Sequence, residues 1–314
     1  MTARAGAFGV PIDERGLSRF AWLTLFYNLA VILWGAYVRA SGSGAGCGSH
    51  WPLCNGEVIP LDAGSRTLIE FAHRLSSGFS LVLAGAVAWW GAQVFPRAHA
   101  ARSAAMRVLT FTVVEALIGA FIVLLGLVAE NQSMTRAASI SLHYVNTLLL
   151  LAALVQTAWR SGAAARPRAE LWSSRSAWRI AIAGVVLTGA TGAITALGDT
   201  LFPALSLAEG MRAELSIDAP LLLALRIYHP LVAVSTALYL LWFVDARITV
   251  SPDDRSGRKL QTGLRSLVLF QLMLGFANVL LLAPTVLQLT HLLVAETVWV
   301  LLILLRERSD NRPA

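Results

Sequence analysis

Eight long apolar runs constrain the fold of this chain more than any other feature of its sequence. They cover residues 18–39, 68–95, 105–129, 137–158, 178–198, 220–244, 262–283 and 285–305. A helix needs about 20 apolar residues to cross the hydrocarbon core of a membrane, and these runs are too long for barrel strands. With 56% hydrophobic and 14% charged residues, the composition excludes an ordinary soluble protein. We therefore predict an all-α, polytopic membrane protein with eight transmembrane helices.

The net charge of +7 comes from basic residues that gather at the chain ends and in alternate connections. This pattern indicates membrane topology and argues against nucleic acid as a partner. The two ends of the chain and the connections after runs two, four and six are rich in base: Arg4, Arg15, Arg19; Arg97, Arg102, Arg107; Arg160, Arg166, Arg168, Arg175, Arg179; Arg247, Arg255, Arg258, Lys259; Arg306, Arg308, Arg312. The other connections are poor in base. Positive residues mark the cytoplasmic side, so both termini are predicted to be cytoplasmic in a cell (plasma) membrane protein. The alternative is a cleaved signal peptide that ends near residues 40–46, but the first apolar run is longer than the apolar region of a signal peptide.

The first outer connection holds the only two cysteines, Cys47 and Cys54. The outer side of a membrane permits disulfides, and six intervening residues can close a small ring if the Cα atoms approach to about 5–6 Å. The alternatives are two unrelated small residues, or a metal site with His50. Two thiolates and one imidazole would leave a tetrahedral zinc one ligand short. We predict a Cys47–Cys54 disulfide.

Histidines give the strongest functional signal. Two of the six are in connections, and the other four lie one in each even-numbered run, about five to nine residues from its outer end: His73, His143, His229 and His291. At about 1.5 Å per residue, all four are about 8–14 Å deep. An ionisable group inside a membrane is a functional candidate, although one histidine alone can simply bond a neighbouring helix. Four histidines at matching depth favour two pairs of axial heme ligands. A zinc or copper site is less favoured, because no cysteine or second carboxylate lies at that depth to complete its ligand set.

An internal repeat indicates how the histidines pair. "EALIGAFIVLLGL" from Glu115 and "QLMLGFANVLLLA" from Gln271 each place a glycine four residues after a polar side chain. The first and fifth runs end similarly, in "GAYVRASGSG" and "GAITALGDT". We predict two pseudo-repeated four-helix bundles, residues 1–160 and 161–314. The pairs are then His73 with His143, and His229 with His291.

The two halves differ beside their first histidine. Glu70 is three residues before His73 and shares its helical face, whereas the equivalent position before His229 holds Arg226. A glutamate at a heme edge can exchange protons with a reacting group. Arg74 and Arg226 suit heme propionates, or they extend to the membrane surface. This asymmetry indicates one reactive site and one electron-transfer site.

The stretch "GSGAGCGSHWPLCNGEVIP" followed by "IEFAHR" resembles the first outer loop and second helix of the heme A synthase family. The resemblance covers almost the whole chain, including eight spans, two halves and histidines on the even helices. The spacing of Cys47 and Cys54 is similar to that of the family members with a loop disulfide. Pro230, directly after His229, departs from the arginine expected there. As a proline beyond a first turn it is expected to kink the sixth helix, which leaves that propionate contact open.

The resemblance implies a specific division of labour. The N-terminal half would bind heme O between His73 and His143, with Glu70 assisting oxidation of a ring methyl to a formyl group, giving heme A for terminal oxidases. The C-terminal half would hold heme b, an iron cofactor, on His229 and His291. Implied partners are an unidentified electron donor, heme O synthase and cytochrome oxidase assembly proteins. A di-heme b-type electron-transfer protein or a heme carrier is the alternative, and both leave Glu70 and the cysteine loop without a role.

Overall fold

The computed structural model describes residues 13–61, 63–162, 175–248, 250 and 254–309, and within these it confirms all eight predicted spans. Seven of the spans are single helices: α1 Glu14–Ala40, α2 Ser65–Val94, α3 Ala100–Leu124, α4 Met134–Ser161, α5 Arg175–Leu201, α9 Arg255–Leu280 and α10 Thr285–Ser309. The sixth, Leu221–Arg247, consists of α7 Leu221–Ala224, the 3₁₀ turn η2 Leu225–Ile227, and α8 Tyr228–Arg247. The described residues form no β-strand, so the protein is an all-helical, multi-pass membrane protein.

Polar caps and left-handed turns set the helix ends. Asp13 accepts a hydrogen bond from the Gly16 N–H, and Ser133 accepts one from the Arg136 N–H. Such caps satisfy backbone donors that have no partner in the first turn. The third span ends at residue 124 and not at the predicted 129, because the chain turns at Gly126, whose φ is +62°. Apolar composition alone did not show that turn.

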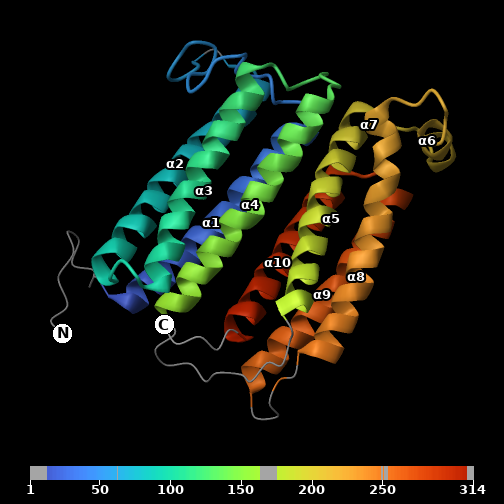
Figure 1. Cartoon of the computed structure of the whole chain (residues 1–314). Coiled ribbons are helices and arrows are strands. Elements are labelled where there is room, and N and C mark those ends of the chain that lie inside the picture. The colour runs from blue at the N-terminus through green and yellow to red at the C-terminus, as the bar shows by residue number, and fades with distance from the viewer. Residues whose placement is uncertain (1–12, 62, 163–174, 249, 251–253, 310–314) are drawn as a thin grey trace.

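The long helices gather into two groups, which lie side by side in Figure 1. Helices α1 to α4 form one group, and α5, α8, α9 and α10 form the other. In the first group α1 packs on α2 and α4, and α3 packs on the same two helices. In the second group α5 packs on α8 and α9 packs on α10. This grouping supports the predicted division of the chain near residue 160.

Helices α4 and α10 join the two groups. The indole N–H of Trp299 on α10 donates to the Leu148 carbonyl oxygen on α4 at 2.7 Å, in a fully buried position. Nearer the ends of the same helices, Arg160 makes two hydrogen bonds to the carboxylate of Glu307, both 2.8 Å long. A bidentate pair of this kind fixes orientation as well as distance. The seam between the groups is therefore specific and does not rest on apolar packing alone.

Pro230 falls in the first turn of α8, directly after the η2 turn. A proline ring clashes with the carbonyl four residues earlier in a regular α-helix, which here belongs to Arg226. The tighter 3₁₀ turn at 225–227 replaces regular helix at that point. The expected irregularity of the sixth span is thus present, just before the proline.

The start of α1 and the end of α10 lie at one end of the bundles, and the cysteine loop and α6 (Leu207–Glu214) lie at the other (Figure 1). This follows from an even number of spans. Four of the basic residues used to predict the topology, Arg4, Arg166, Arg168 and Arg312, lie outside the described residues. Which end faces the cytoplasm stays a prediction.

Candidate functional site

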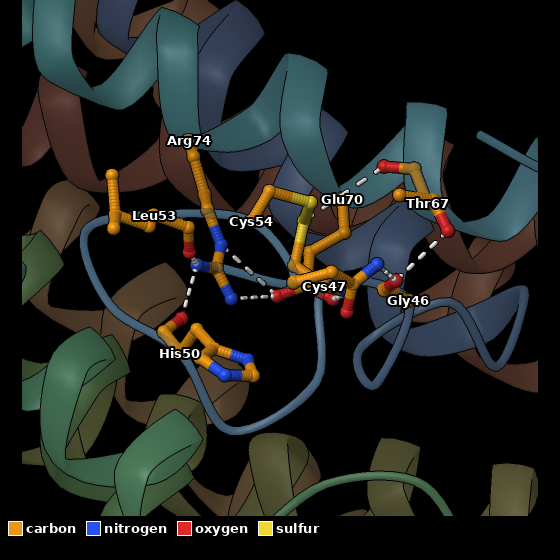
Figure 2. Close-up of polar contacts among 9 residues, drawn as sticks. Gly46, Cys47, His50, Leu53, Cys54, Thr67, Glu70 and Arg74 are labelled. Carbon is orange, nitrogen blue, oxygen red and sulfur yellow. Dashed lines mark hydrogen bonds and ion pairs between the residues drawn. A yellow bond between two sulfur atoms is a disulfide. The ribbon is translucent and has the colours of Figure 1, made fainter. Parts of the chain in front are cut away.

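The predicted disulfide is present in the loop between α1 and α2. Cys47 and Cys54 are bonded, with their Cα atoms 4.4 Å apart, and both side chains are buried. Because both sulfurs are used in this bond, they cannot serve as the thiolates of a zinc site with His50. The loop is also pressed onto α2, since a Cβ at Gly46 would lie 2.5 Å from the Arg66 carbonyl oxygen. The Thr67 hydroxyl donates to the Gly46 carbonyl oxygen at 2.8 Å (Figure 2).

Glu70 and Arg74 tie this loop to α2, and Figure 2 shows their side chains turned toward it. One carboxylate oxygen of Glu70 accepts the Cys47 N–H at 2.8 Å, and the other faces the Arg74 guanidinium, whose Nε lies 3.1 Å away. Arg74 also donates to the carbonyl oxygens of His50 and Leu53. Glu70 is only 4% exposed. The carboxylate predicted to be catalytic therefore holds the loop in this structure, and the guanidinium predicted to bind a propionate is already paired.

The four intramembrane histidines lie at like depth. Each is six to nine residues past the first residue of its span, about 9–14 Å along the helix axis. His143 lies within electrostatic range of His73, and His229 within range of His291. Each predicted pair therefore lies within one group of helices, and its joint binding of a heme stays a prediction.

Glycines support the first histidine of each pair. A Cβ at Gly35 on α1 would lie 2.8 Å from Cε1 of His73, and a Cβ at Gly192 on α5 would lie 3.0 Å from Cε1 of His229. Only a glycine allows helix and ring to approach this closely. Gly35 and Gly192 begin the two similar sequence stretches GAYV and GAIT. Equivalent positions of the proposed repeat therefore both hold a glycine that lies against a histidine ring.

The second histidine of each pair contacts the polar residue of the preceding helix. Glu115 on α3 forms an ion-pair contact with Nδ1 of His143, and Gln271 on α9 lies 3.1 Å from Nε2 of His291. These are the two polar residues that the sequence repeat aligned. Their contact with the histidines was not predicted, because the repeat indicates which residues correspond but not where they point.

Arg226 has two carboxylate partners in the described structure. Its guanidinium lies 2.8 Å from Asp199 on α5 and 3.2 Å from Glu214 on α6. Burial raises the pKa of the Glu214 carboxyl above its usual value, against the opposing effect of Arg226. Arg226 therefore bridges the outer connection and the bundle, and a propionate would have to compete with two carboxylates for it.

Arg39 joins the two groups of helices at the end of the bundles that carries the cysteine loop. From the end of α1 it donates to the Ala196 carbonyl oxygen and the Thr200 hydroxyl, both 2.5 Å away on α5, and to Gln288 on α10 at 3.0 Å. A cation at the end of an apolar run could have indicated such a role, but nothing in the sequence identifies its partners. Sequence reasoning therefore missed the role of Arg39 in joining the two groups of helices.

The histidine pairs fit the axial positions of heme iron. Two imidazoles supply the two axial nitrogens that a low-spin heme takes, and Nδ1 of His73 and of His291 have no hydrogen-bond partner among the described groups. Among the described residues, no three histidine, cysteine, aspartate or glutamate side chains are grouped so that they could hold a bare metal ion. The donor set therefore suits a cofactor that brings its own equatorial ligands.

Comparisons with known proteins agree on one family. Residues 18–303 match the model of the COX15-CtaA family, described as cytochrome oxidase assembly protein. Two proteins named protoheme IX farnesyltransferase, from two strains of Thermus thermophilus, are 43% and 42% identical over 302 residues, 95% of this chain but 49% of theirs. The chain thus spans about half the length of these relatives. Heme A synthase of Bacillus pumilus is 39% identical over 141 residues, 44% of this chain and 45% of that protein; that of Shouchella clausii is 47% identical over 77 residues, 24% and 26% respectively.

Proposed function

The chain belongs to the COX15-CtaA family, and we propose that it is a heme A synthase, an oxidoreductase that converts a methyl group of heme O to a formyl group. One observation carries the proposal: four intramembrane histidines at like depth, with His73 and His143 in one group of helices and His229 and His291 in the other. Two heme sites in one chain suit an enzyme that holds a heme substrate in one half and a heme cofactor in the other. The partial matches to two proteins named heme A synthase support the same activity.

The N-terminal site is proposed to bind the substrate. His73 and His143 hold and orient heme O, whose iron supplies the oxidation chemistry when the heme is bound. The disulfide loop covers the outer end of this site, with both cysteines buried and Arg74 bound to two loop carbonyls. A covered site limits access of water to the reacting group. This half thus combines a ligand pair, a cover and a buried carboxylate.

Glu70 is the proposed proton-transfer group. With dioxygen as the oxidant and electrons from a donor, the methyl group becomes a formyl group, the remaining oxygen is reduced to water and protons are taken up, so a group that exchanges protons is required near the ring. Glu70 lies three residues before His73, on the neighbouring position of one helical face. In the present structure its carboxylate contacts the Cys47 N–H and Arg74, so its proposed role requires these contacts to rearrange when heme binds.

The C-terminal site is proposed to hold heme b on His229 and His291 and to pass electrons between the substrate site and an electron donor. We further propose that the protein lies in the cell membrane with both termini cytoplasmic, and that it works with heme O synthase and cytochrome oxidase assembly proteins. The family description and the names of the Thermus thermophilus relatives support such partners.

The direct test supplies purified protein with heme O and a chemical reductant in air and identifies the hemes by mass spectrometry. Appearance of a formyl heme supports the proposal. Unchanged heme O with both sites loaded contradicts it and favours an electron-transfer protein or a carrier. A parallel reaction with heme b and farnesyl diphosphate tests the activity named for the Thermus relatives, and a farnesylated product there would replace our assignment.

Glu70→Gln tests the catalytic role, with Glu57→Gln in the exposed part of the same loop as its control. Glutamine keeps an oxygen for the Cys47 N–H but cannot take up the proton. We expect Glu70→Gln to keep both hemes and to lose most product formation, or to stop at a hydroxylated heme, while Glu57→Gln behaves as the unaltered protein. A normal rate of heme A formation in Glu70→Gln would leave Glu70 with only its loop-holding role.

A further inference from the structure

The two ligands of the N-terminal pair have different surroundings. One oxygen of the Glu115 carboxylate contacts Nδ1 of His143, and the other accepts the Thr147 hydroxyl at 2.6 Å. Thr147 is one turn beyond His143 and also lies 3.1 Å from its carbonyl oxygen. The carboxylate is thus fixed on both sides. Nδ1 of His143 and the contacting oxygen of Glu115 have no hydrogen-bond partner among the described groups, so their mutual contact is an ion-pair contact.

The other three histidines lack a carboxylate partner within the described structure. Nδ1 of His73 has no hydrogen-bond partner there. His229 lies 3.2 Å from the Thr191 hydroxyl, and His291 lies 3.1 Å from the Gln271 amide nitrogen. Glu115 and Gln271 correspond in the sequence repeat and differ in charge, and each contacts a histidine: Glu115 at Nδ1 of His143 and Gln271 at Nε2 of His291.

A carboxylate behind a ligating imidazole changes the ligand itself. When Nδ1–H donates to a carboxylate, the tautomer and ring orientation are fixed and the other nitrogen becomes a stronger base. A stronger donor stabilises the more highly charged ferric iron over ferrous iron, so the reduction potential falls. An imidazole without such a partner is the weaker and more easily displaced ligand.

We propose that Glu115 is a positioning residue that makes His143 the permanent axial ligand of the N-terminal heme and leaves His73 as the exchangeable one. This rests on the proposed function, because it requires heme to bind between these two histidines. The iron would then open on the side of His73, the ligand that shares its helical face with Glu70. A vacated coordination position and the proton-transfer group would thus lie on the same face of the heme.

The first test is potentiometric titration of the two hemes in the full-length protein. In Glu115→Gln the preference of the N-terminal heme for ferric over ferrous iron should fall by roughly tenfold, which is the size of effect that groups hydrogen-bonded to metal ligands usually have. For a one-electron couple this corresponds to a rise in the reduction potential of about 59 mV. Glu115→Asp should largely restore the original potential, and the C-terminal heme should not change. An N-terminal potential that is unmoved in Glu115→Gln overturns the inference.

The reciprocal variant guards against misfolding. Gln271→Glu places a carboxylate beside His291 and should lower the potential of the C-terminal heme, leaving the N-terminal one as an internal control. A residue that only supports the fold would alter heme content or melting temperature but not the potential of a retained heme. No shift in Gln271→Glu would contradict the reasoning.

Carbon monoxide binding tests the difference between the two ligands. His73→Gly should retain the N-terminal heme on His143 and bind carbon monoxide readily, and added imidazole should restore the low-spin spectrum. His143→Gly should retain less of that heme. If His143→Gly keeps the N-terminal heme and His73→Gly loses it, the inference is overturned. The proposed function would still hold if that protein makes heme A. An N-terminal half that binds no heme O overturns both.

Discussion

A single methyl group added at Gly35 should remove the N-terminal heme without unfolding the protein. The added Cβ would lie 2.8 Å from Cε1 and 3.1 Å from Nε2 of His73. Since carbon atoms in contact normally lie about 3.5–4.0 Å apart, the ring must retreat by about 0.7 Å or more. The obstructing atoms belong to the end of a side chain, so the ring moves and not the helix. A ligand to a metal tolerates errors of only about 0.2 Å.

Stability and heme binding should therefore change in opposite directions in Gly35→Ala. Alanine favours a helix over glycine by roughly 0.5–1 kcal/mol, so the melting temperature in detergent should hold or rise. Heme content by pyridine hemochrome should show loss of the N-terminal heme alone. Gly119→Ala on α3 is the control, because nothing lies within 4 Å of its Cβ. Full heme content with an unchanged low-spin spectrum in Gly35→Ala would refute the reasoning.

Three further predictions concern other parts of the molecule. Cys47 and Cys54 should resist alkylation in freshly purified protein until a reductant is added; immediate labelling of both would show that the disulfide is absent. Glu296→Met should raise the unfolding free energy by about 1–3 kcal/mol, because both carboxylate oxygens are buried without a hydrogen-bond partner among the described groups; a lower melting temperature would contradict this. Burial alone would raise the pKa of Asp254, but the Gly257 N–H and Arg308 outweigh it, so the pKa lies below its usual value. The stability that the ionised Asp254 contributes is complete above the unfolded pKa of about 3.9, and it is lost as the pH falls through the lower pKa of the folded state. Asp254→Asn should therefore make the melting temperature less dependent on pH in the acid range. Melting curves recorded at a series of pH values check this.

The sequence was sufficient to predict how far each residue lies along a helix but not which way it points. Apolar runs and helical rise gave the eight spans and the depth of His73, His143, His229 and His291. Spans in lipid are apolar all round, so their sequence carries little information about rotation about the helix axis. For that reason the contact between Glu115 and His143 was not foreseen.

Contacts between polar residues that lie far apart in the sequence could not be predicted either. Arg39 bonds α5 and α10, more than 150 residues further on, and no local pattern encodes such a pairing. Helix α6 was also missed, because eight residues with mixed polarity give no periodic signal that stands out from a loop. Glu70 was predicted to lie at a heme edge, and its contact with the backbone N–H of Cys47 was not anticipated.

The shared use of Glu70 by the loop and by the proposed reaction has a thermodynamic consequence. The carboxylate that would take up the proton is the same one that accepts the Cys47 N–H and pairs with Arg74, which in turn binds two loop carbonyls. Because one carboxylate connects the Cys47 N–H to Arg74, contacts from separate parts of the loop are coupled through it. Loss of the Cys47 contact also disturbs the carboxylate that orients Arg74, so the loop should leave α2 as one cooperative unit and not residue by residue.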